Sequence, residues 1–218
     1  MKFYYKVIQS HVPVGKIIDT NYCINEYRVL RNNELKSFFE KAENFSNEFE
    51  LSISLVLNDT LLKLMKLHKT FIIKGIKYIV KMKKLAKERE KCNFILNDES
   101  NFFIDYILEK KRKNLEIEEN VILPSRFNSS FFFESADDCN KYYPKFNCNG
   151  EIQIVKVEFI ETRKSFTFDN SIISDFSRCI TSIDYLNHAK LYLSGYISDN
   201  PLLEVVFQGK YKIISYIN

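Results

Sequence analysis

Hydrophobic and polar positions alternate near both ends of the chain, whereas the middle of the chain shows helical spacing. Residues 2–9, KFYYKVIQ, are rich in aromatic and β-branched types and predict a strand. In residues 150–169 the apolar positions alternate with polar ones, as at Ile154 and Val157, which predicts a second strand. Residues 201–217, PLLEVVFQGKYKIISYI, predict a strand, a turn and a further strand.

Between Glu34 and about Asn114 the apolar residues recur with the period of an α-helix. One face of the first helix carries Leu35, Phe38, Phe39 and Ala42. A second helix is expected to start at Asp59 as its N-cap, and others are expected over residues 74–91 and 98–114. The last of these begins with acids and ends with bases, as the helix dipole favours. We interpret these apolar faces as core.

After Pro124 the pattern changes again. PSRFNSSFFFES predicts a short aromatic strand, and the segment that follows predicts a helix with Ser135 as its N-cap. Residues 173–196 predict one or two helices before the closing strands. The order of elements indicates an α+β fold. We expect a single domain over residues 1–218, with residues 34–120 forming a mainly helical insertion.

Composition and charge narrow the function classes. The 218 residues include five cysteines and three histidines, with no CxxC pair, so neither a zinc site nor a disulfide framework is indicated. No apolar run reaches 18 residues and no signal peptide is recognisable, so we expect a cytoplasmic protein without a membrane partner. The chain has a net charge of +4, and its basic residues cluster in residues 63–91. This basic segment is interpreted either as a solvated helix face or as a surface that binds nucleic acid.

Glu204 is a carboxylate within an otherwise apolar strand. Two interpretations are open. Its side chain either points outward between Leu203 and Val205, because strand residues alternate between faces, or it is held in an active site. An unpaired buried carboxylate would cost several kcal/mol, which is comparable to the stability of a domain at about 5–15 kcal/mol.

Three separated segments suggest a family: YYKV at residues 4–7, SRFNSSFFFESADDCNKYY at 125–143, and NPLLEVVFQGKYKIISYI at 200–217. Their order and residue pattern resemble those of the ADP-ribosyltransferase superfamily, which includes diphtheria toxin and the poly-ADP-ribose polymerases. A closer resemblance is to poorly characterised bacterial domains of this superfamily with the motifs FYHV, PSRL and LQIVKV. This chain has YYKV, PSRF, IQIVKV and AKLYLSGY in the same order.

The resemblance implies a split antiparallel β-sheet core with a helical insertion between the first and second strand groups. It implies NAD as co-substrate, no metal, and Glu204 as the catalytic carboxylate. The candidate NAD-binding residues are Tyr5, Lys6, His11, Ser125, Arg126, Ser129, Phe131 and Tyr142. Lys6 stands where the close relatives have histidine, and His11 is a possible substitute.

The implied function is ADP-ribosyl transfer to a macromolecular acceptor, in a toxin–antitoxin, anti-phage or effector setting. The acceptor is RNA or DNA, slightly favoured by the lysine-rich segment, or protein, and an antitoxin or inhibitor protein is a possible partner. Because Lys6 replaces histidine, a catalytically degenerate fold that serves as a binding or regulatory module is an alternative. An NAD glycohydrolase and a nucleic-acid-binding protein without enzyme activity are the others.

Overall fold

In this computed structural model the described residues are 2–22, 33–49, 51–57, 82–89, 99–142 and 152–217. The predicted N-cap Asp59 lies outside them. The chain divides into two compact units. The first comprises residues 1–25, 112–174 and 191–218, and the second comprises residues 26–111 and 175–190.

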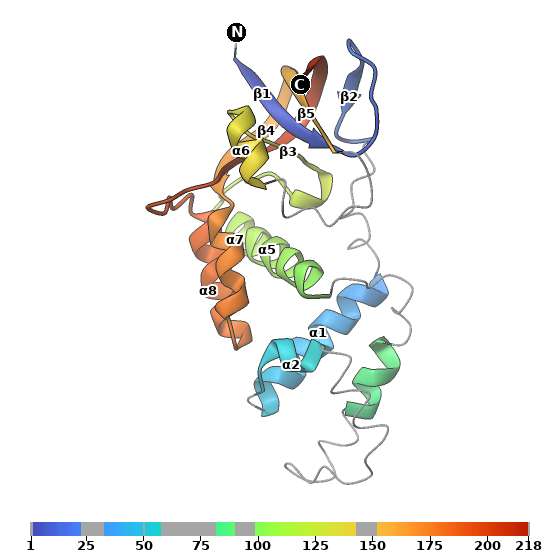
Figure 1. Ribbon diagram of the computed structural model, residues 1–218. Coiled ribbons are helices and arrows are strands. Elements are labelled where there is room, and N and C mark those ends of the chain that lie inside the picture. The colour runs from blue at the N-terminus through green and yellow to red at the C-terminus, as the bar shows by residue number, and fades with distance from the viewer. Residues whose placement is uncertain are drawn as a thin grey trace. The chain divides into compact units, whose positions relative to one another are not determined.

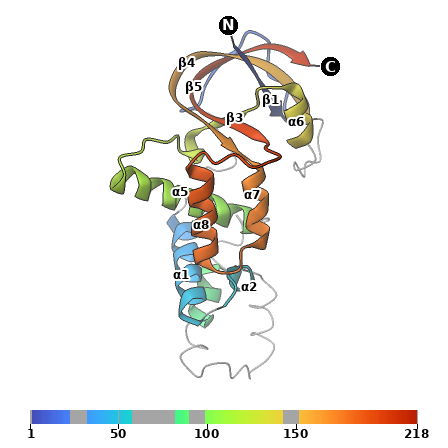
Figure 2. The same cartoon turned by 90° about the vertical axis from the view of Figure 1, so that its left-hand side faces the viewer.

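The first unit contains an antiparallel sheet. Its strands are β1 (Phe3–Ile8), β2 (Ile17–Asp19), β3 (Ser130–Phe132), β4 (Gln153–Asp169) and β5 (Leu203–Ile217). The strand order is β1-β4-β5-β2, and β3 pairs with β5 on the same edge as β2. The long strands β4 and β5 curve side by side (Figure 2). The α+β class and the antiparallel sheet are therefore confirmed.

The sheet curls back toward its first strand. Just after β3, the backbone N–H of Phe133 donates to the carbonyl of Tyr5 at 2.8 Å, and the N–H of Tyr5 donates to the carbonyl of Phe133 at 2.8 Å. One hydrophobic cluster fills the space this curvature encloses; its buried members are Phe132, Val155, Val157, Val205, Phe207, Tyr211 and Ile213. We call the side of the sheet that carries this cluster the inner face and the other side the outer face.

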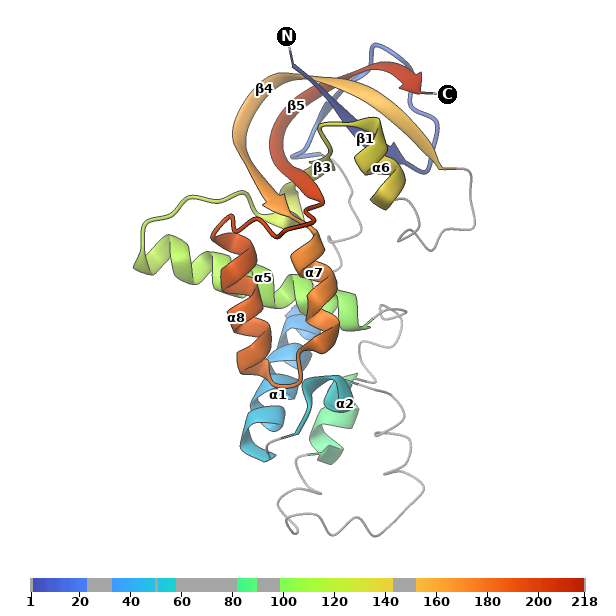
Figure 3. The same ribbon diagram turned by 60° about the vertical axis from the view of Figure 1, so that its left-hand side comes forward.

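The outer face carries a second, smaller cluster. Helix α6 (Ala136–Tyr142) lies beside β1 (Figure 3) and packs Cys139 against Phe133 and Leu202. The helix begins as the sequence predicted, because the Ser135 hydroxyl oxygen accepts the backbone N–H of Asp138 at 3.1 Å. Capping of this kind satisfies a donor that has no partner within the helix.

The expectation of two closing strands is wrong. Residues 203–217 form the single strand β5, and Gly209 lies within it instead of in a turn. Opposite Gly209, the register of β4 shifts on both sides of Glu161 and Thr162. A Cβ at position 209 would lie 1.9 Å from the carbonyl oxygen of Glu161. Glycine therefore permits a close backbone approach at a bulge, which a sequence pattern does not separate from a turn.

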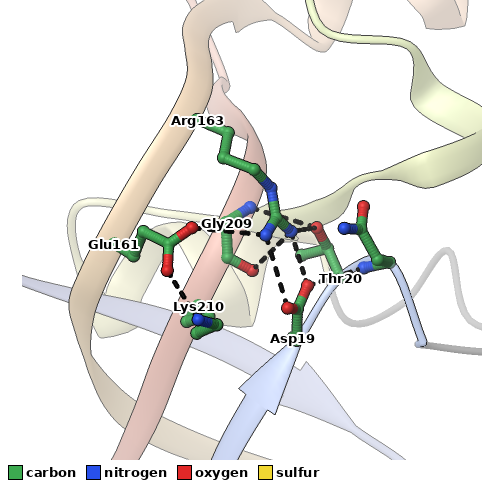
Figure 4. A network of polar contacts seen from close by, with 7 residues as sticks. Asp19, Thr20, Glu161, Arg163, Gly209 and Lys210 are labelled. Atoms are coloured by element: carbon green, nitrogen blue, oxygen red, sulfur yellow. Dashed lines mark hydrogen bonds and ion pairs between the residues drawn. The ribbon is translucent and has the colours of Figure 1, made fainter.

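Polar side chains fasten β2 beside this bulge (Figure 4). Arg163 donates to the Asp19 carboxylate at 2.5 Å, and Lys210 pairs with Glu161 at 2.7 Å. The Thr20 hydroxyl oxygen accepts the backbone N–H of Gly209 at 3.0 Å. These charges are matched within the network, so we assign it a role in holding the short strand β2 against β5.

The second unit is helical in its described residues. It contains α1 (Asn33–Phe49), α2 (Ile53–Leu57), a helix over residues 82–89, and residues of α5 (Glu99–Glu118) up to Lys111 (Figure 1). The predicted face of α1 is confirmed, since its four apolar side chains, Leu35, Phe38, Phe39 and Ala42, are fully buried. The ring of Phe39 meets that of Phe103 on α5 edge-on at 5.4 Å.

The described residues also form the helices α7 (Ser171–Asp175) and α8 (Ser182–Leu193) and the 3-10 turns η2 (Arg126–Asn128) and η4 (Phe176–Arg178). Helix α5 continues four residues past the predicted end at Asn114, so its last turn carries no basic residue and the predicted dipole match at that end is wrong. Within the described residues, no helix combines the length and apolar character needed to cross a membrane.

A buried carboxylate cluster as the candidate functional site

Glu204 is fully buried at the start of β5, and three side chains bind its carboxylate. Its Oε1 accepts from Arg126 Nη1 at 2.6 Å and from the Tyr192 hydroxyl at 2.5 Å. Its Oε2 accepts from Asn170 Nδ2 at 2.7 Å. The interpretation that Glu204 points outward to solvent is therefore wrong. Residues 204–207 are all buried, so both faces of the strand are covered there. Side chains that alternate between the two faces therefore alternate between two buried environments, and neither face is open to solvent.

Arg126 supplies the positive charge from the PSR motif. It lies in η2 and is itself buried, and its guanidinium lies 4.6 Å from the centre of the Phe131 ring. The local chain is fixed around it, because the Ser129 hydroxyl donates to the Ser125 carbonyl at 2.6 Å. The residues Ser125, Arg126, Ser129 and Phe131 thus form one local unit that presents the guanidinium to Glu204.

Tyr192 joins the two charged groups. It lies in the last turn of α8, where its ring stacks on Phe168 with a centroid distance of 4.6 Å and an interplanar angle of 19°. Its hydroxyl accepts from Arg126 Nη1 at 2.6 Å while donating to Glu204. One hydroxyl therefore satisfies a donor and an acceptor that are both buried, as buried polar groups require.

Strand β4 ends at Asp169, and the next residue, Asn170, is the one that donates to Glu204. Oδ2 of Asp169 accepts the backbone N–H and the hydroxyl of Ser198 at 2.9 and 2.6 Å. Its Oδ1 accepts the backbone N–H groups of Ser171 and Leu202 at 2.9 and 3.0 Å. Burial raises the pKa of this carboxyl, but the hydrogen bonds from Ser198, Ser171 and Leu202 outweigh it and lower the pKa to about 2.

The ion pair is costly to break from one side. Arg126 and Glu204 are removed from water together, so each is the counter-charge of the other. Removing one partner of a buried pair costs about 3–5 kcal/mol, because the charge left behind has neither water nor a counter-ion. Any chemistry at Glu204 that displaces Arg126 therefore has to compensate the charge of the carboxylate in another way.

Of the other predicted residues, Tyr5 and Tyr142 lie near each other on the outer face. Both pack on the cluster of Phe133, Cys139 and Leu202, and the rings of Phe133 and Tyr142 are 5.1 Å apart. Glu204 is also on the outer face, because its neighbours Val205 and Phe207 are inner-face core residues.

Lys6 lies on the inner face. It pairs with Val155 across the sheet, and it shares a face with Tyr4 and Ile8, which are each two residues away and pack on the inner cluster. Its ammonium is 5.2 Å from the centre of the Phe132 ring and 3.5 Å from the carbonyl oxygen of Phe131. The structure therefore places Lys6 and Glu204 on opposite faces.

His11 is also distant from the cluster along the sheet. Its ring stacks on that of Tyr216 with a centroid distance of 5.1 Å. Tyr216 lies near the C-terminal end of β5, whereas Glu204 lies at the start of this strand. The structure brings Ser125, Arg126, Ser129, Phe131 and Glu204 together, but it does not bring His11 to them.

Sequence reasoning missed Asp169, Asn170 and Tyr192. Tyr192 lies in the AKLYLSGY segment, so its position in that motif was the available signal. Asp169 and Asn170 carried a weaker one, since two polar residues at the end of a strand are common in turns. Their contacts with Ser198, Leu202 and Glu204 depend on the fold.

Metal and thiol chemistry find no support in the described part of the chain. Among those residues no group of three or more His, Cys, Asp or Glu side chains could hold a metal ion. Cys139 and Cys179 are buried thiols; burial, with the nearby acids adding to it, raises their pKa values to about 12 and about 11. Such thiols are poor nucleophiles.

Most of the basic segment 63–91 lies outside the described residues. In its described part, residues 82–89, the basic side chains Lys83, Lys84 and Lys87 are exposed, whereas Met82 and Leu85 are buried. This short helix therefore has an apolar face and a basic face.

Comparison with known proteins identifies the family. No curated protein matches the chain. Residues 7–218 match the family model described as "Protein of unknown function (DUF2441)". The match includes every residue of the cluster around Glu204, and the chain belongs to the DUF2441 family.

Proposed function

We propose that this protein is an NAD-dependent ADP-ribosyltransferase that modifies a macromolecular acceptor. One observation carries the proposal: the 2.6 Å contact between Arg126 and Glu204 joins two of the segments on which the resemblance rests. A third, the YYKV strand, is hydrogen-bonded to Phe133 just after β3. Two of the three segments thus meet at the Glu204 carboxylate, and the third is hydrogen-bonded to the chain just after β3, which supports a shared site.

The reaction places specific demands on that carboxylate. The bond between the nicotinamide nitrogen and ribose C1′ breaks, and its electron pair leaves with nicotinamide. The acceptor nucleophile forms a bond to C1′ and loses its proton. Positive charge develops on the ribose in between, and a fixed carboxylate stabilises it electrostatically. In our proposal Glu204 has this role.

Because Glu204 is buried, Arg126 has to release it when NAD binds. The NAD pyrophosphate is an anion that a guanidinium binds with two parallel hydrogen bonds, so Arg126 exchanges one anionic partner for another. Glu204 in turn exchanges the guanidinium for the developing positive charge of the ribose. No uncompensated charge remains in the site, which meets the requirement set by the buried pair.

Tyr5, Phe131 and Tyr142 are the proposed aromatic contacts for nicotinamide on the outer face. Nucleic acid is the favoured acceptor because the basic segment exposes Lys83 and Lys87, and protein is the alternative. A toxin or defence enzyme of this kind would be restrained by an inhibitor protein.

The test is transfer from labelled NAD in a cell extract by the wild type and by Glu204→Gln. Glu134→Gln is the matched control, because Glu134 is an exposed carboxylate paired with Lys2. We expect label with the wild type and the control, and a loss of roughly 100- to 1,000-fold with Glu204→Gln. Nuclease or protease treatment of the product identifies the acceptor class. Thermal unfolding of each variant shows whether a loss reflects misfolding.

The result that refutes the proposal is absence of both labelled macromolecule and free ADP-ribose. Free ADP-ribose without a labelled macromolecule would instead identify an NAD glycohydrolase, in which water replaces the acceptor.

A catalytically degenerate fold that serves as a binding module is the second candidate. The observation that favours it is the complete burial of Glu204, both of whose oxygens are bound by side chains of the protein itself. This arrangement also suits a carboxylate with a purely structural role. It predicts no NAD turnover by the wild type, together with a large loss of stability in Glu204→Gln.

A further inference from the structure

The two oxygens of Glu204 are held from two different parts of the fold. Tyr192, at the end of α8, donates to Oε1 at 2.5 Å, and Asn170, at the end of β4, donates to Oε2 at 2.7 Å. Arg126 shares Oε1 with Tyr192. Withdrawal of Arg126 therefore leaves one hydrogen bond on each oxygen.

A carboxylate bound through both oxygens by separate donors cannot rotate about its last bond without breaking one of them. With Tyr192 or Asn170 removed, the same carboxylate would have a single donor after the departure of Arg126. Its orientation would then vary, and the electrostatic benefit of a fixed charge would fall.

The two donors are themselves fixed by consecutive residues at the end of β4. Phe168 stacks on the Tyr192 ring at 4.6 Å. Asp169 binds the backbone of Ser198 and Leu202, and the backbone N–H of Asn170 donates to the carbonyl of Leu202 at 2.8 Å. Phe168, Asp169 and Asn170 thus bind both the segment that leads into β5 and the ring of Tyr192, and Asn170 is itself the second donor to Glu204.

We propose that Tyr192 and Asn170 are positioning residues that keep the Glu204 carboxylate in one orientation while Arg126 exchanges partners. The proposal rests on the proposed transferase function and assigns two residues to it. Tyr192 and Asn170 act through Glu204 and not through contact with NAD. Their loss should therefore lower kcat and leave KM nearly unchanged.

The experiment compares NAD consumption by Tyr192→Phe and Asn170→Ala with that of the wild type. Tyr192→Phe keeps the stacked ring and removes only the hydroxyl. Its matched control is Tyr196→Phe, since Tyr196 lies in the same segment but is half exposed. We expect kcat to fall roughly 10- to 100-fold in each variant, as loss of one hydrogen bond to a charged group implies, with KM within about twofold.

A second readout does not depend on NAD. Urea unfolding of Tyr192→Phe, Glu204→Gln and the double variant gives a double-mutant cycle, and we expect the double loss to be smaller than the sum of the single losses. Additive losses would show that the hydroxyl and the carboxylate are not coupled in solution and would overturn the proposal.

The outcomes separate the two proposals. If Glu204→Gln is inactive but both positioning variants keep the wild-type kcat, the positioning role is refuted and the transferase function stands. A rise in KM with unchanged kcat refutes it as well, because it would indicate contact with substrate. If the wild type does not consume NAD, the proposed function fails and the positioning role with it, even where the unfolding cycle shows coupling.

Discussion

Asp169 makes a testable contribution to stability that depends on pH. Its carboxylate is fully buried and accepts hydrogen bonds from Ser198, Ser171 and Leu202, which hold its pKa at about 2 against an ordinary value of 3.8. Because the folded pKa is below the unfolded one, the stabilisation is present above about pH 4. It is lost as the pH falls through the folded pKa of about 2.

The magnitude follows from the two pKa values. The difference between 3.8 and about 2 is a little under two units. At 1.36 kcal/mol per unit this amounts to roughly 2.4 kcal/mol of unfolding free energy. Asp169→Asn removes this pH-linked part, because asparagine does not titrate. It also turns a donor toward the N–H of Ser198, which adds a cost that is independent of pH.

The measurement is urea unfolding of the wild type and of Asp169→Asn at several pH values from 7 down to 2. We expect the difference between their unfolding free energies to be largest at pH 5–7 and to shrink by about 1.5–2.5 kcal/mol by pH 2. Asp137→Asn, at an exposed position on α6, is the control. Other acids also titrate in this range, but they affect both proteins equally. A difference that stays constant over the whole pH range would refute the assignment of the low pKa to Asp169.

Two substitutions and one labelling experiment test the packing of the first unit. Gly209→Ala should destabilise the protein by about 3 kcal/mol or more in thermal unfolding, because the alanine Cβ would lie 1.9 Å from the Glu161 carbonyl oxygen. A loss of stability below about 1 kcal/mol would contradict this close approach. Ser135→Ala should cost about 1 kcal/mol in urea unfolding through loss of the cap to Asp138, and no loss would show that the cap is not formed. Burial raises the pKa of the Cys139 thiol to about 12, so this thiol should resist alkylation at pH 8 until the protein is unfolded. Peptide mass spectrometry would measure the labelling, and equal labelling of the folded and unfolded chains would contradict the burial of Cys139.

The periodic parts of the fold could be predicted because local pattern and tertiary packing agree there. The four apolar positions of α1 are all buried, and the alternating segment before residue 170 is the long strand β4. The cap at Ser135 was also predictable, because capping depends only on neighbouring residues. Gly209 shows the limit of this reasoning, since the feature that requires glycine is the Glu161 carbonyl on another strand.

The candidate site was predictable only in part, for a related reason. Arg126 and Glu204 were each singled out, but their pairing across 78 residues is a property of the fold. Alternation along a strand indicates which residues share a face, and it cannot show that both faces are covered. Near Glu204 the inner cluster covers one face, and Arg126 and Tyr192 cover the other. Tyr192 and Asn170 complete the set of side chains that bind Glu204, and their contacts with it depend on the fold.

The two faces of the sheet also bear on the lysine in β1 that differs from the pattern of the domains that the sequence resembles. The resemblance aligns Lys6 with a histidine of the related domains, yet Lys6 is directed toward the inner face with Tyr4 and Ile8. Tyr5 is the residue of β1 that shares the outer face with Glu204. A side chain on the inner face could reach the outer face, where Glu204 lies, only if β1 shifted its register by one residue. That shift would move all the side chains of β1 to the opposite face. The lysine is therefore a weaker argument against the proposed activity than the sequence suggested, and Tyr5 is the residue of β1 at which to test the proposed NAD binding.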